Sequence, residues 1–254
     1  MISLVVVGAS GRMGRAVLEA ALEDGSIEVA AAVSRSDPGL GVKWESSLEA
    51  AIRPGRVVIE FSTPEVAGEV ARRCGAQAVP LVSGTTALTS EYEALISATA
   101  RSSAVLRSAN FSLGLLALRR ALETALRALP EWDVEIVERH HRGKADSPSG
   151  TALRLAADVA ALRGWDERAF RHGREGRVGT RHDAEIGLHA VRGGSWVGDH
   201  SVLIAGAGEA LELRHTVQDR SAFAHGALRA AKFVAHAPAG LYTLEAIPVA
   251  AGGA

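Results

Sequence analysis

Short apolar runs alternate with longer segments of helical spacing over the first 110 residues. The apolar runs are rich in β-branched residues and predict strands at residues 4–7, 27–33, 57–61, 79–82 and 104–106. Helical spacing fills residues 12–24, 65–74 and 90–99. Strands and helices that alternate in this way are typical of βαβ units, so we predict a parallel sheet. Polar loops follow the strands, at the sheet edge where ligands bind in such folds.

Beyond residue 110 the pattern changes. An Ala/Leu-rich helix is predicted at residues 113–129, a strand at 134–137 and a second helix at 151–162. Residues 164–183 are rich in Arg, Gly and His and predict a loop. Three strands with Gly-rich turns follow at residues 185–191, 195–204 and 210–217, and a helix at 222–235. This order predicts a second α/β region with an antiparallel or mixed sheet.

Three glycines, Gly8, Gly11 and Gly14, lie between the first predicted strand and the first helix. Their GxxGxxG spacing is a variant of the dinucleotide fingerprint, in which glycines permit a tight turn and close approach of the backbone to a pyrophosphate. The helix N-terminus adds free N–H groups and the positive end of its dipole. A plain tight turn is the alternative, but the position at the first strand-to-helix junction favours nucleotide binding.

The residue after the second strand indicates which nicotinamide cofactor is used. An acid there binds the ribose 2′-hydroxyl of NAD, whereas a basic residue favours the 2′-phosphate of NADP. This chain has Ser34-Arg35-Ser36 at that place and no acid before Asp37. We therefore predict that NADPH is preferred, through Arg35, with NADH as the second candidate. A solvated loop is the alternative.

Two more polar loops follow the fourth and fifth predicted strands, Ser83-Gly84-Thr85-Thr86 and Ala109-Asn110-Phe111. Turns and helix caps explain such residues without any ligand. The functional alternative is that both loops border a nicotinamide, with Phe111 or Phe61 shielding the ring.

Residues 138–152, ERHHRGKADSPSGTA, hold most of the candidate chemistry. A histidine whose pKa lies near neutrality can transfer a proton, which makes His140 and His141 candidates, and Lys144 adds a fixed positive charge. Ser149-Gly150-Thr151 is a helix start whose N–H groups can face a carboxylate. Taken singly, these are a strand end, a surface lysine and an N-cap. Together they suit a small anionic substrate that receives a proton.

Composition narrows the function further. The net charge of −1 supplies no general attraction for nucleic acid or an anionic membrane. The single Cys74 excludes an intramolecular disulfide and a multi-cysteine zinc site, and no carboxylate–histidine spacing predicts a metal. The initial apolar run is too short for a signal peptide and no apolar stretch approaches about 20 residues. We therefore expect a cytoplasmic protein with a small-molecule partner, no metal and no membrane span.

The chain resembles the 4-hydroxy-tetrahydrodipicolinate reductase family, also called dihydrodipicolinate reductase, of bacterial lysine and diaminopimelate synthesis. The resemblance runs nearly end to end, and the element HHxxKxDxPSGTA is its most specific part. The matching segments are VVGASGRMGRAV from Val6, FSTPE from Phe61, SGTT from Ser83, SANFSLG from Ser108, ERHHRGKADSPSGTA from Glu138, VRGGSWVGDH from Val191 and AGLYTL near the C-terminus. The chain departs from the family pattern at Ser34, where many members have an acid, and at Glu60-Phe61-Ser62, where members commonly have Asp-Phe-Thr.

The resemblance implies a Rossmann-like dinucleotide-binding domain at residues 1–110 and 221–254. It also implies a substrate-binding and tetramerisation domain at residues 111–220, a homotetramer, and reduction of a cyclic dicarboxylate by NAD(P)H. His140 and Lys144 would be catalytic, and the sequence leaves open which of them gives up the proton. The substrate would be held by His141, Lys144, Ser149, Gly150 and Thr151. Cofactor contacts would fall on Gly8, Arg12, Met13, Gly14, Arg35, Phe61, Gly84, Thr85, Thr86, Ala109, Asn110 and Phe111.

Two other classes share part of this pattern. An NADP-sensing protein without turnover needs the glycine loop but has no need for His140 together with Lys144. Another two-domain dehydrogenase, such as an aspartate or semialdehyde dehydrogenase, is the second alternative. The semialdehyde enzyme requires a nucleophilic cysteine, and Cys74 lies inside a predicted helix, which is a poor position for one.

Overall fold

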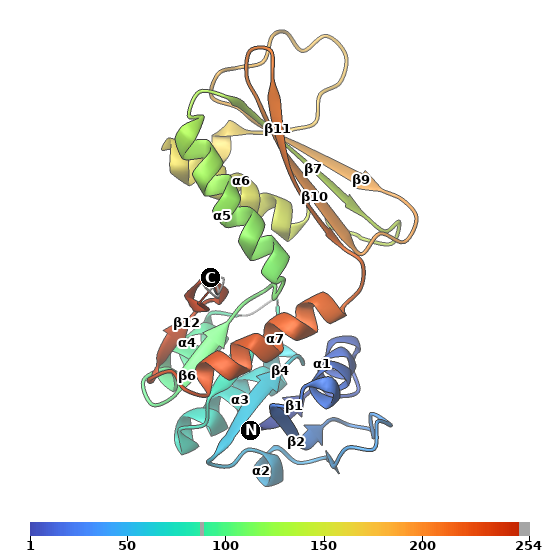
Figure 1. Ribbon diagram of the computed structural model, residues 1–254, viewed down its shortest axis with the longest axis vertical. Coiled ribbons are helices and arrows are strands. Elements are labelled where there is room, and N and C mark those ends of the chain that lie inside the picture. Colours follow the sequence, from blue (N-terminus) through green and yellow to red (C-terminus); the bar gives the residue numbers. More distant parts are fainter. Residues whose placement is uncertain (87–88, 249–254) are drawn as a thin grey trace. The chain divides into compact units, whose positions relative to one another are not determined.

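The computed structural model describes residues 1–86 and 89–248 (Figure 1). The chain divides into two compact units: unit 1 is Met1–Ser112 with Arg220–Ala254, and unit 2 is Leu113–Asp219. The last six residues of the dinucleotide-binding domain predicted from the sequence, 249–254, lie outside the described residues. No helix within the described part of the chain is long and apolar enough to cross a membrane.

Unit 1 contains a seven-stranded sheet, counted over the described residues, with the order β12-β6-β5-β4-β1-β2-β3. Each recorded pairing between neighbours is parallel, which confirms the predicted parallel sheet. β1 lies near the centre because its Leu4–Val7 segment is apolar on both faces and fully buried. The strands are β1 (Ile2–Val7), β2 (Ile27–Val33), β3 (Trp44–Glu45), β4 (Arg56–Glu60), β5 (Leu81–Ser83), β6 (Ala104–Arg107) and β12 (Gly240–Tyr242).

Helices cover both faces of this sheet. α1 packs against α7 on one face, while α3 packs against α4 on the other, above a core that includes Val70, Cys74 and Ile96. The N-terminal part of the unit and the final helix thus share one fold although they are far apart in the sequence. The helices are α1 (Arg12–Glu23), α2 (Leu48–Ala51), α3 (Pro64–Gln77), α4 (Ser90–Thr99), α7 (Ser221–Val234) and the 3₁₀ turn η2 (Leu244–Ala246).

The sequence pattern missed the shortest elements of unit 1. β3 has two residues and α2 has four, so neither shows a period. β12 is recognisable only from its pairing with β6, because a three-residue strand has no signal of its own. α3 also extends beyond its predicted end at residue 74, to Gln77, where Ala78 closes the helix in a left-handed conformation with a φ of 52°.

Unit 2 is a mixed five-stranded sheet with the order β11-β10-β7-β9-β8, and two helices, α5 and α6, lie on one of its faces (Figure 1). β7 pairs in parallel with β9 and antiparallel with β10, which confirms the predicted mixed sheet. The elements are α5 (Leu113–Ala128), β7 (Asp133–His140), α6 (Gly150–Arg163), η1 (Glu167–Ala169), β8 (Phe170–His172), β9 (Ile186–Arg192), β10 (Gly198–Ala205) and β11 (Ala210–Val217).

The sequence prediction was wrong in two places of unit 2. β7 does not end at residue 137 but continues to His140, because cross-strand pairs with β9 and β10 support its polar end. The predicted loop at residues 164–183 contains η1 and β8, and β8 forms because Phe170 and His172 pair with β9. In both places a polar segment is ordered by a partner strand rather than by its own apolar pattern.

β7 alternates strictly between its two faces. Val134, Ile136, Glu138 and His140 are buried, while the residues between them are partly exposed. The buried positions Val134 and Ile136 join the apolar core beneath α5 and α6. Glu138 and His140 therefore lie on the helix-covered face of the sheet, next to the start of α6.

Candidate active site

The glycine loop of unit 1 has no room for side chains at two positions. Gly8 follows β1 with a φ of +80°, and a Cβ there would lie 2.1 Å from the carbonyl oxygen of Phe61. A Cβ on Gly14 would lie 2.2 Å from the carbonyl oxygen of Gly8. The loop is thus packed between the end of β4 and the start of α1, and only glycine fits either position.

The N-terminus of α1 has no side-chain cap. Gly11 occupies the N-cap position, no side chain accepts a hydrogen bond there, and the first turn contains no acidic residue. The N–H groups of the first turn, which includes Arg12 and Met13, and the positive end of the helix dipole are therefore available for an external anion. This geometry fits the pyrophosphate of a dinucleotide.

Glu60, at the end of β4, is a site residue that the sequence analysis did not single out. Its fully buried carboxylate accepts hydrogen bonds from the Ser62 amide (2.7 Å) and hydroxyl (2.7 Å) and from the hydroxyls of Ser83 (2.9 Å) and Thr85. The Ser62 amide also lies 3.0 Å from Thr85 Oγ1. Glu60 thereby connects the loop after β4 to the loop after β5. Thr85, which the sequence analysis assigned to the cofactor, donates its hydroxyl hydrogen bond to Glu60.

Aromatic contacts join the same loops. A Cβ on Gly84 would lie 2.0 Å from the ring of Phe61, so glycine allows the ring to lie over this part of the loop. The Phe61 ring meets the Phe111 ring edge-on, with centroids 5.5 Å apart. Phe111 is fully buried and Phe61 is partly exposed, so of the two candidate shields only Phe61 presents a ring surface. Thr86 and Ala109 are exposed on the adjoining loops, and Asn110 is half-buried.

Arg35 lies on the exposed loop after β2. The hydroxyl of Ser34 donates to the carbonyl of Ser36 (2.7 Å), and Asp37 accepts from the Gly39 amide (2.8 Å). The nearest carboxylate in the sequence is thus used in its own turn, and Arg35 has no ion-pair partner among the described residues. Its guanidinium is free to bind an anion.

In unit 2, strand register brings together groups from three strands. Across the sheet, His140 on β7 is paired with Arg192 on β9, and Glu138 with His200 on β10. Alternation puts all four side chains on the helix-covered face. The rings of His140 and His200 are in edge-on contact, with centroids 5.2 Å apart.

Glu138 is fully buried and lies at the centre of this group. It accepts hydrogen bonds from both terminal nitrogens of Arg192 (2.7 and 2.8 Å), and its Oε2 lies 2.6 Å from His140 Nδ1. Its other oxygen accepts from the Ser149 amide at 3.0 Å. Burial acts to raise the pKa of Glu138, but the bonds from Arg192, His140 and Ser149 outweigh it and lower the pKa, so the group is a carboxylate at neutral pH.

Lys144 and His141 follow on the loop after β7. Lys144 Nζ contacts both oxygens of Asp146 (2.7 and 2.8 Å), and this hydrogen bond is the main cause of the lowered pKa of Asp146. The His141 amide donates to the carbonyl of Trp196 (2.9 Å), and its side chain is exposed. Lys144 is thus held on the loop by a carboxylate that is itself largely exposed.

α6 begins at this loop. Ser149 is its N-cap, and the Ser149 hydroxyl accepts from the Ala152 amide (3.2 Å) and contacts His200 Nε2 (3.0 Å). A Cβ on Gly150 would meet no protein atom within 4 Å, so protein packing does not require glycine there and space is left beside the helix start. Thr151 is half-buried in the first turn. The first turn contains no acidic residue, so it too can receive an anion.

Cys74 is fully buried in α3 of unit 1. Burial, together with the nearby charge of Glu60, raises the pKa of its thiol. A thiol of this kind is not a nucleophile. The requirement of a semialdehyde dehydrogenase for an activated cysteine is therefore not met.

Comparison with known protein families covers both units. The family model described as dihydrodipicolinate reductase, N-terminus, matches residues 2–111, and the one described as dihydrodipicolinate reductase, C-terminus, matches residues 114–247. The chain belongs to the dihydrodipicolinate reductase family.

Individual relatives agree with this assignment. The chain is 41% identical to 4-hydroxy-tetrahydrodipicolinate reductase of Halorhodospira halophila, with 94% of this chain and 96% of that one covered. It is 42% identical to the enzyme of the same name from Rubrobacter xylanophilus, with 96% and 97% covered. A solved structure of dipicolinate-bound dihydrodipicolinate reductase from Paenisporosarcina sp. TG-14 matches with a TM-score of 0.81 and 26% identity, over 98% of this chain and 100% of that one.

The sequence analysis did not single out Arg192 and His200, although both contact residues of the segment Glu138–Ala152. Arg192 and His200 belong to the segment VRGGSWVGDH, but only strand register brings them to Glu138. Glu138 precedes His140 by two residues, but the strand predicted from the sequence ended at residue 137, so only the longer β7 of the structure puts the two side chains on one face. Asp146 stands in the element HHxxKxDxPSGTA, two residues after Lys144, but its contact with Lys144 is seen only in the fold of the loop.

His200 predicts a pH dependence of stability. Burial, followed by the proximity of His140, lowers the pKa of His200 to about 4 from the usual 6.5. The unfolded chain therefore binds a proton that the folded chain does not, and stability is lost as the pH falls from 6.5 toward about 4. Between pH 6.5 and pH 5 this loss should be roughly 1.5 kcal/mol.

The measurement is urea unfolding of the wild type and of His200→Gln across this pH range. The wild type should lose stability more steeply than the variant as the pH falls, because the variant lacks the titrating ring. Parallel curves for the two proteins would contradict the assignment of this pH dependence to His200.

Proposed function

We propose that this protein reduces 4-hydroxy-tetrahydrodipicolinate to tetrahydrodipicolinate with NAD(P)H, in the diaminopimelate route of lysine biosynthesis. The observation that carries the proposal is the segment Glu138–Ala152, where an imidazole, an ammonium group and a helix start without acidic residues lie close together in unit 2. The names of the relatives support the same reaction. A cytoplasmic location is part of the proposal, because the reaction consumes a nicotinamide cofactor of that compartment.

The substrate is a small dicarboxylate, as is the dipicolinate bound to the Paenisporosarcina relative. One carboxylate would lie against the first turn of α6, near the N–H groups of Gly150 and Thr151, with His141 and Lys144 adding positive charge. The N-cap Ser149 holds that turn in place. His140 and Lys144 are the two groups able to move a proton at the substrate.

The cofactor would be held by unit 1. The pyrophosphate would bind at Gly8, Arg12, Met13 and Gly14, where a tight loop meets the uncapped start of α1. NAD(P)H supplies a hydride when bound; the protein's part is to position both ligands and to supply charge. The partly exposed ring of Phe61, with the adjoining residues Gly84, Thr85, Thr86, Ala109, Asn110 and Phe111, would border the nicotinamide.

Lys144→Ala should lower turnover by about 100-fold or more, because the variant loses both a proton donor and a charge on the substrate. The assay is NADPH oxidation with freshly generated 4-hydroxy-tetrahydrodipicolinate, and cofactor affinity is measured separately by NADPH fluorescence. Affinity for NADPH should stay within about twofold, since Lys144 lies in unit 2.

The matched control is Arg154→Ala, which removes another cation of unit 2, exposed on α6 and paired with Asp158. Its turnover should equal that of the wild type. If the wild-type protein binds NADPH but does not oxidise it with this substrate, the proposed function is contradicted and the NADP-sensing alternative is favoured.

NADPH preference is the second part of the proposal and depends on Arg35. Its guanidinium follows β2, has no described ion-pair partner and can meet a 2′-phosphate. Arg35→Ala should raise the KM for NADPH about tenfold or more and leave the KM for NADH nearly unchanged, because one lost charge-assisted bond is worth roughly 1.5–3 kcal/mol.

Arg101→Ala is the control for Arg35, because Arg101 is also exposed in unit 1 but precedes β6, at the end of its strand away from the carboxyl-terminal loops. It should change neither constant. Equal effects of Arg35→Ala on the two cofactors would show that Arg35 does not select the 2′-phosphate.

A homotetramer, assembled through the substrate-domain sheets, is the third part. In unit 2 the face of the sheet opposite α5 and α6 carries no helix and exposes parts of Val137, Val191 and Leu203 together with charged side chains (Figure 1). A sheet face with this mixture of apolar and charged groups fits an interface between copies of the chain.

Val137→Lys should reduce the mass measured by light scattering from that of four chains to that of a smaller species, because it places an ammonium group at the middle of this face. Leu22→Lys, at an exposed apolar position of α1 in unit 1, is the control and should leave the mass unchanged. A wild-type mass of one chain would refute the tetramer.

A further inference from the structure

The carboxylate of Glu138 connects three separate parts of the candidate active site. One oxygen contacts His140 Nδ1 on the same strand, and the other accepts from the Ser149 amide at the start of α6. Arg192 on β9 binds both oxygens and also donates to the carbonyl of Asp146 (2.7 Å), in the loop that carries Lys144. The ion pair between the buried Glu138 and the partly exposed Arg192 therefore fixes the imidazole, the helix start and the lysine loop with respect to one another.

The contact with Glu138 determines which nitrogen of His140 carries a proton. An ionised carboxylate accepts hydrogen bonds and cannot donate one, so His140 Nδ1 must be protonated to make the 2.6 Å contact. Nε2 makes no hydrogen bond with the described residues, so it is the nitrogen that can exchange a proton with a ligand. The groups that face the ring from neighbouring elements are Arg192 on β9 and His200 on β10.

Arg192 keeps Glu138 in this role. Its two terminal nitrogens occupy one lone pair on each carboxylate oxygen, which leaves the second pair on one oxygen for His140 and on the other for Ser149. An amide in place of the carboxylate could not accept all of these bonds, because its NH₂ group would face either Arg192 and His140 or Arg192 and Ser149. The site thus requires a carboxylate at position 138.

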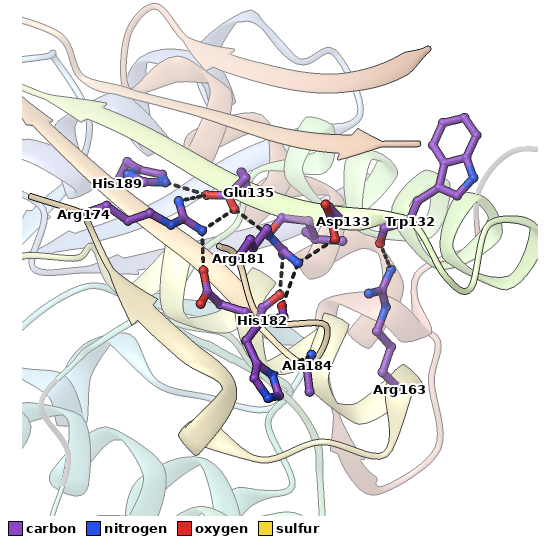
Figure 2. Close-up of polar contacts among 11 residues, drawn as sticks. Trp132, Asp133, Glu135, Arg163, Arg174, Arg181, His182, Ala184 and His189 are labelled. Atoms are coloured by element: carbon purple, nitrogen blue, oxygen red, sulfur yellow. Dashed lines mark hydrogen bonds and ion pairs between the residues drawn. The ribbon is translucent and has the colours of Figure 1, made fainter. Parts of the chain in front are cut away.

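The same strand provides a contrast in Glu135. Figure 2 shows Glu135 contacting Arg174, Arg181 and His189, so it also binds arginines and a histidine. Glu135, however, lies on the opposite face of β7, where its arginines tie down the segment before β9. These contacts lower its pKa to about 2 against the effect of burial. Glu135 matches Glu138 in chemistry and strand but touches none of the candidate catalytic groups.

We propose that Glu138, held by Arg192, is the positioning residue of the active site: it fixes His140 with its proton on Nδ1 and Nε2 toward the substrate, and it fixes the α6 start that binds the substrate carboxylate. The proposal rests on the proposed function for the role of Nε2 in turnover, but the tautomer follows from the geometry alone. It assigns a role to Glu138 as the partner of His140, and to Arg192 as the partner of Glu138.

The first experiment measures kcat, KM and NADPH affinity for Glu138→Gln and for the control Glu135→Gln. Glu138→Gln should lower kcat by about 100-fold, because the imidazole is no longer held in one tautomer, with NADPH affinity within about twofold of the wild type. Glu135→Gln should keep kcat within about twofold. Equal losses of kcat in the two variants would overturn the proposal, because a hydrogen-bonded glutamate on either face of β7 would then have the same effect.

A double substitution tests whether Glu138 acts through His140 or only stabilises the fold. If Glu138 acts through His140, adding Glu138→Gln to His140→Gln should lower kcat by less than about threefold. Losses that multiply would show that Glu138 does not act through His140. If Glu138→Gln alone fails to fold, the double variant Glu138→Gln/Arg192→Met replaces it in every comparison. The double variant removes both charges together and so leaves no unpaired ion.

The tautomer is measured without any turnover, by ¹⁵N solid-state NMR of protein labelled at histidine, with the His140 signals assigned by their loss in His140→Gln. In the neutral ring, Nδ1 should have the shift of a protonated nitrogen and Nε2 that of a bare one. Glu138→Gln should change this pattern and Glu135→Gln should not. A bare Nδ1 in the wild type would overturn the proposal. If the wild type does not turn over the substrate, the proposed function fails, and this measurement still decides whether Glu138 holds His140.

Discussion

The ion pair between the buried Glu138 and the partly exposed Arg192 is the interaction on which the candidate active site depends. A carboxylate without solvent needs partners for its charge and its lone pairs, and here Arg192, His140 and the Ser149 amide provide them. Because these partners come from β9, β7 and the start of α6, satisfying one charge also sets the position of each segment. The free-energy cost of burying the Glu138 carboxylate is therefore offset only when all three segments are in place.

Unit 1 uses a buried carboxylate in a similar way but with different partners. Glu60 receives hydroxyl and amide donors from Ser62, Ser83 and Thr85, and so joins the loops after β4 and β5. Gly8 and Gly14 bring the backbone close enough for these loops to pack against the start of α1. In each unit a glutamate at the carboxyl end of a buried strand holds the loops where a ligand is proposed to bind.

Much of the fold could be predicted because its elements are long and periodic. β2, α4 and β11 have the limits that the apolar pattern indicated. The pattern failed where polar segments are ordered by a neighbour: the last residues of β7, and β8 inside an Arg- and Gly-rich stretch. A strand of three residues pairs only if its partner is present, and no local property of the sequence reports that partner.

The sequence by itself determined which groups are near one another along the chain: the glycine spacing after β1, the helix start at Ser149, and the position of Glu138 two residues before His140. These follow from backbone geometry, which repeats over a few residues. Only the tertiary structure decided that Arg192 and His200 meet Glu138 and His140, that Asp146 holds Lys144, and that Glu60 occupies the Thr85 hydroxyl. Those contacts depend on strand register and loop path, which are set by the packing of the whole unit.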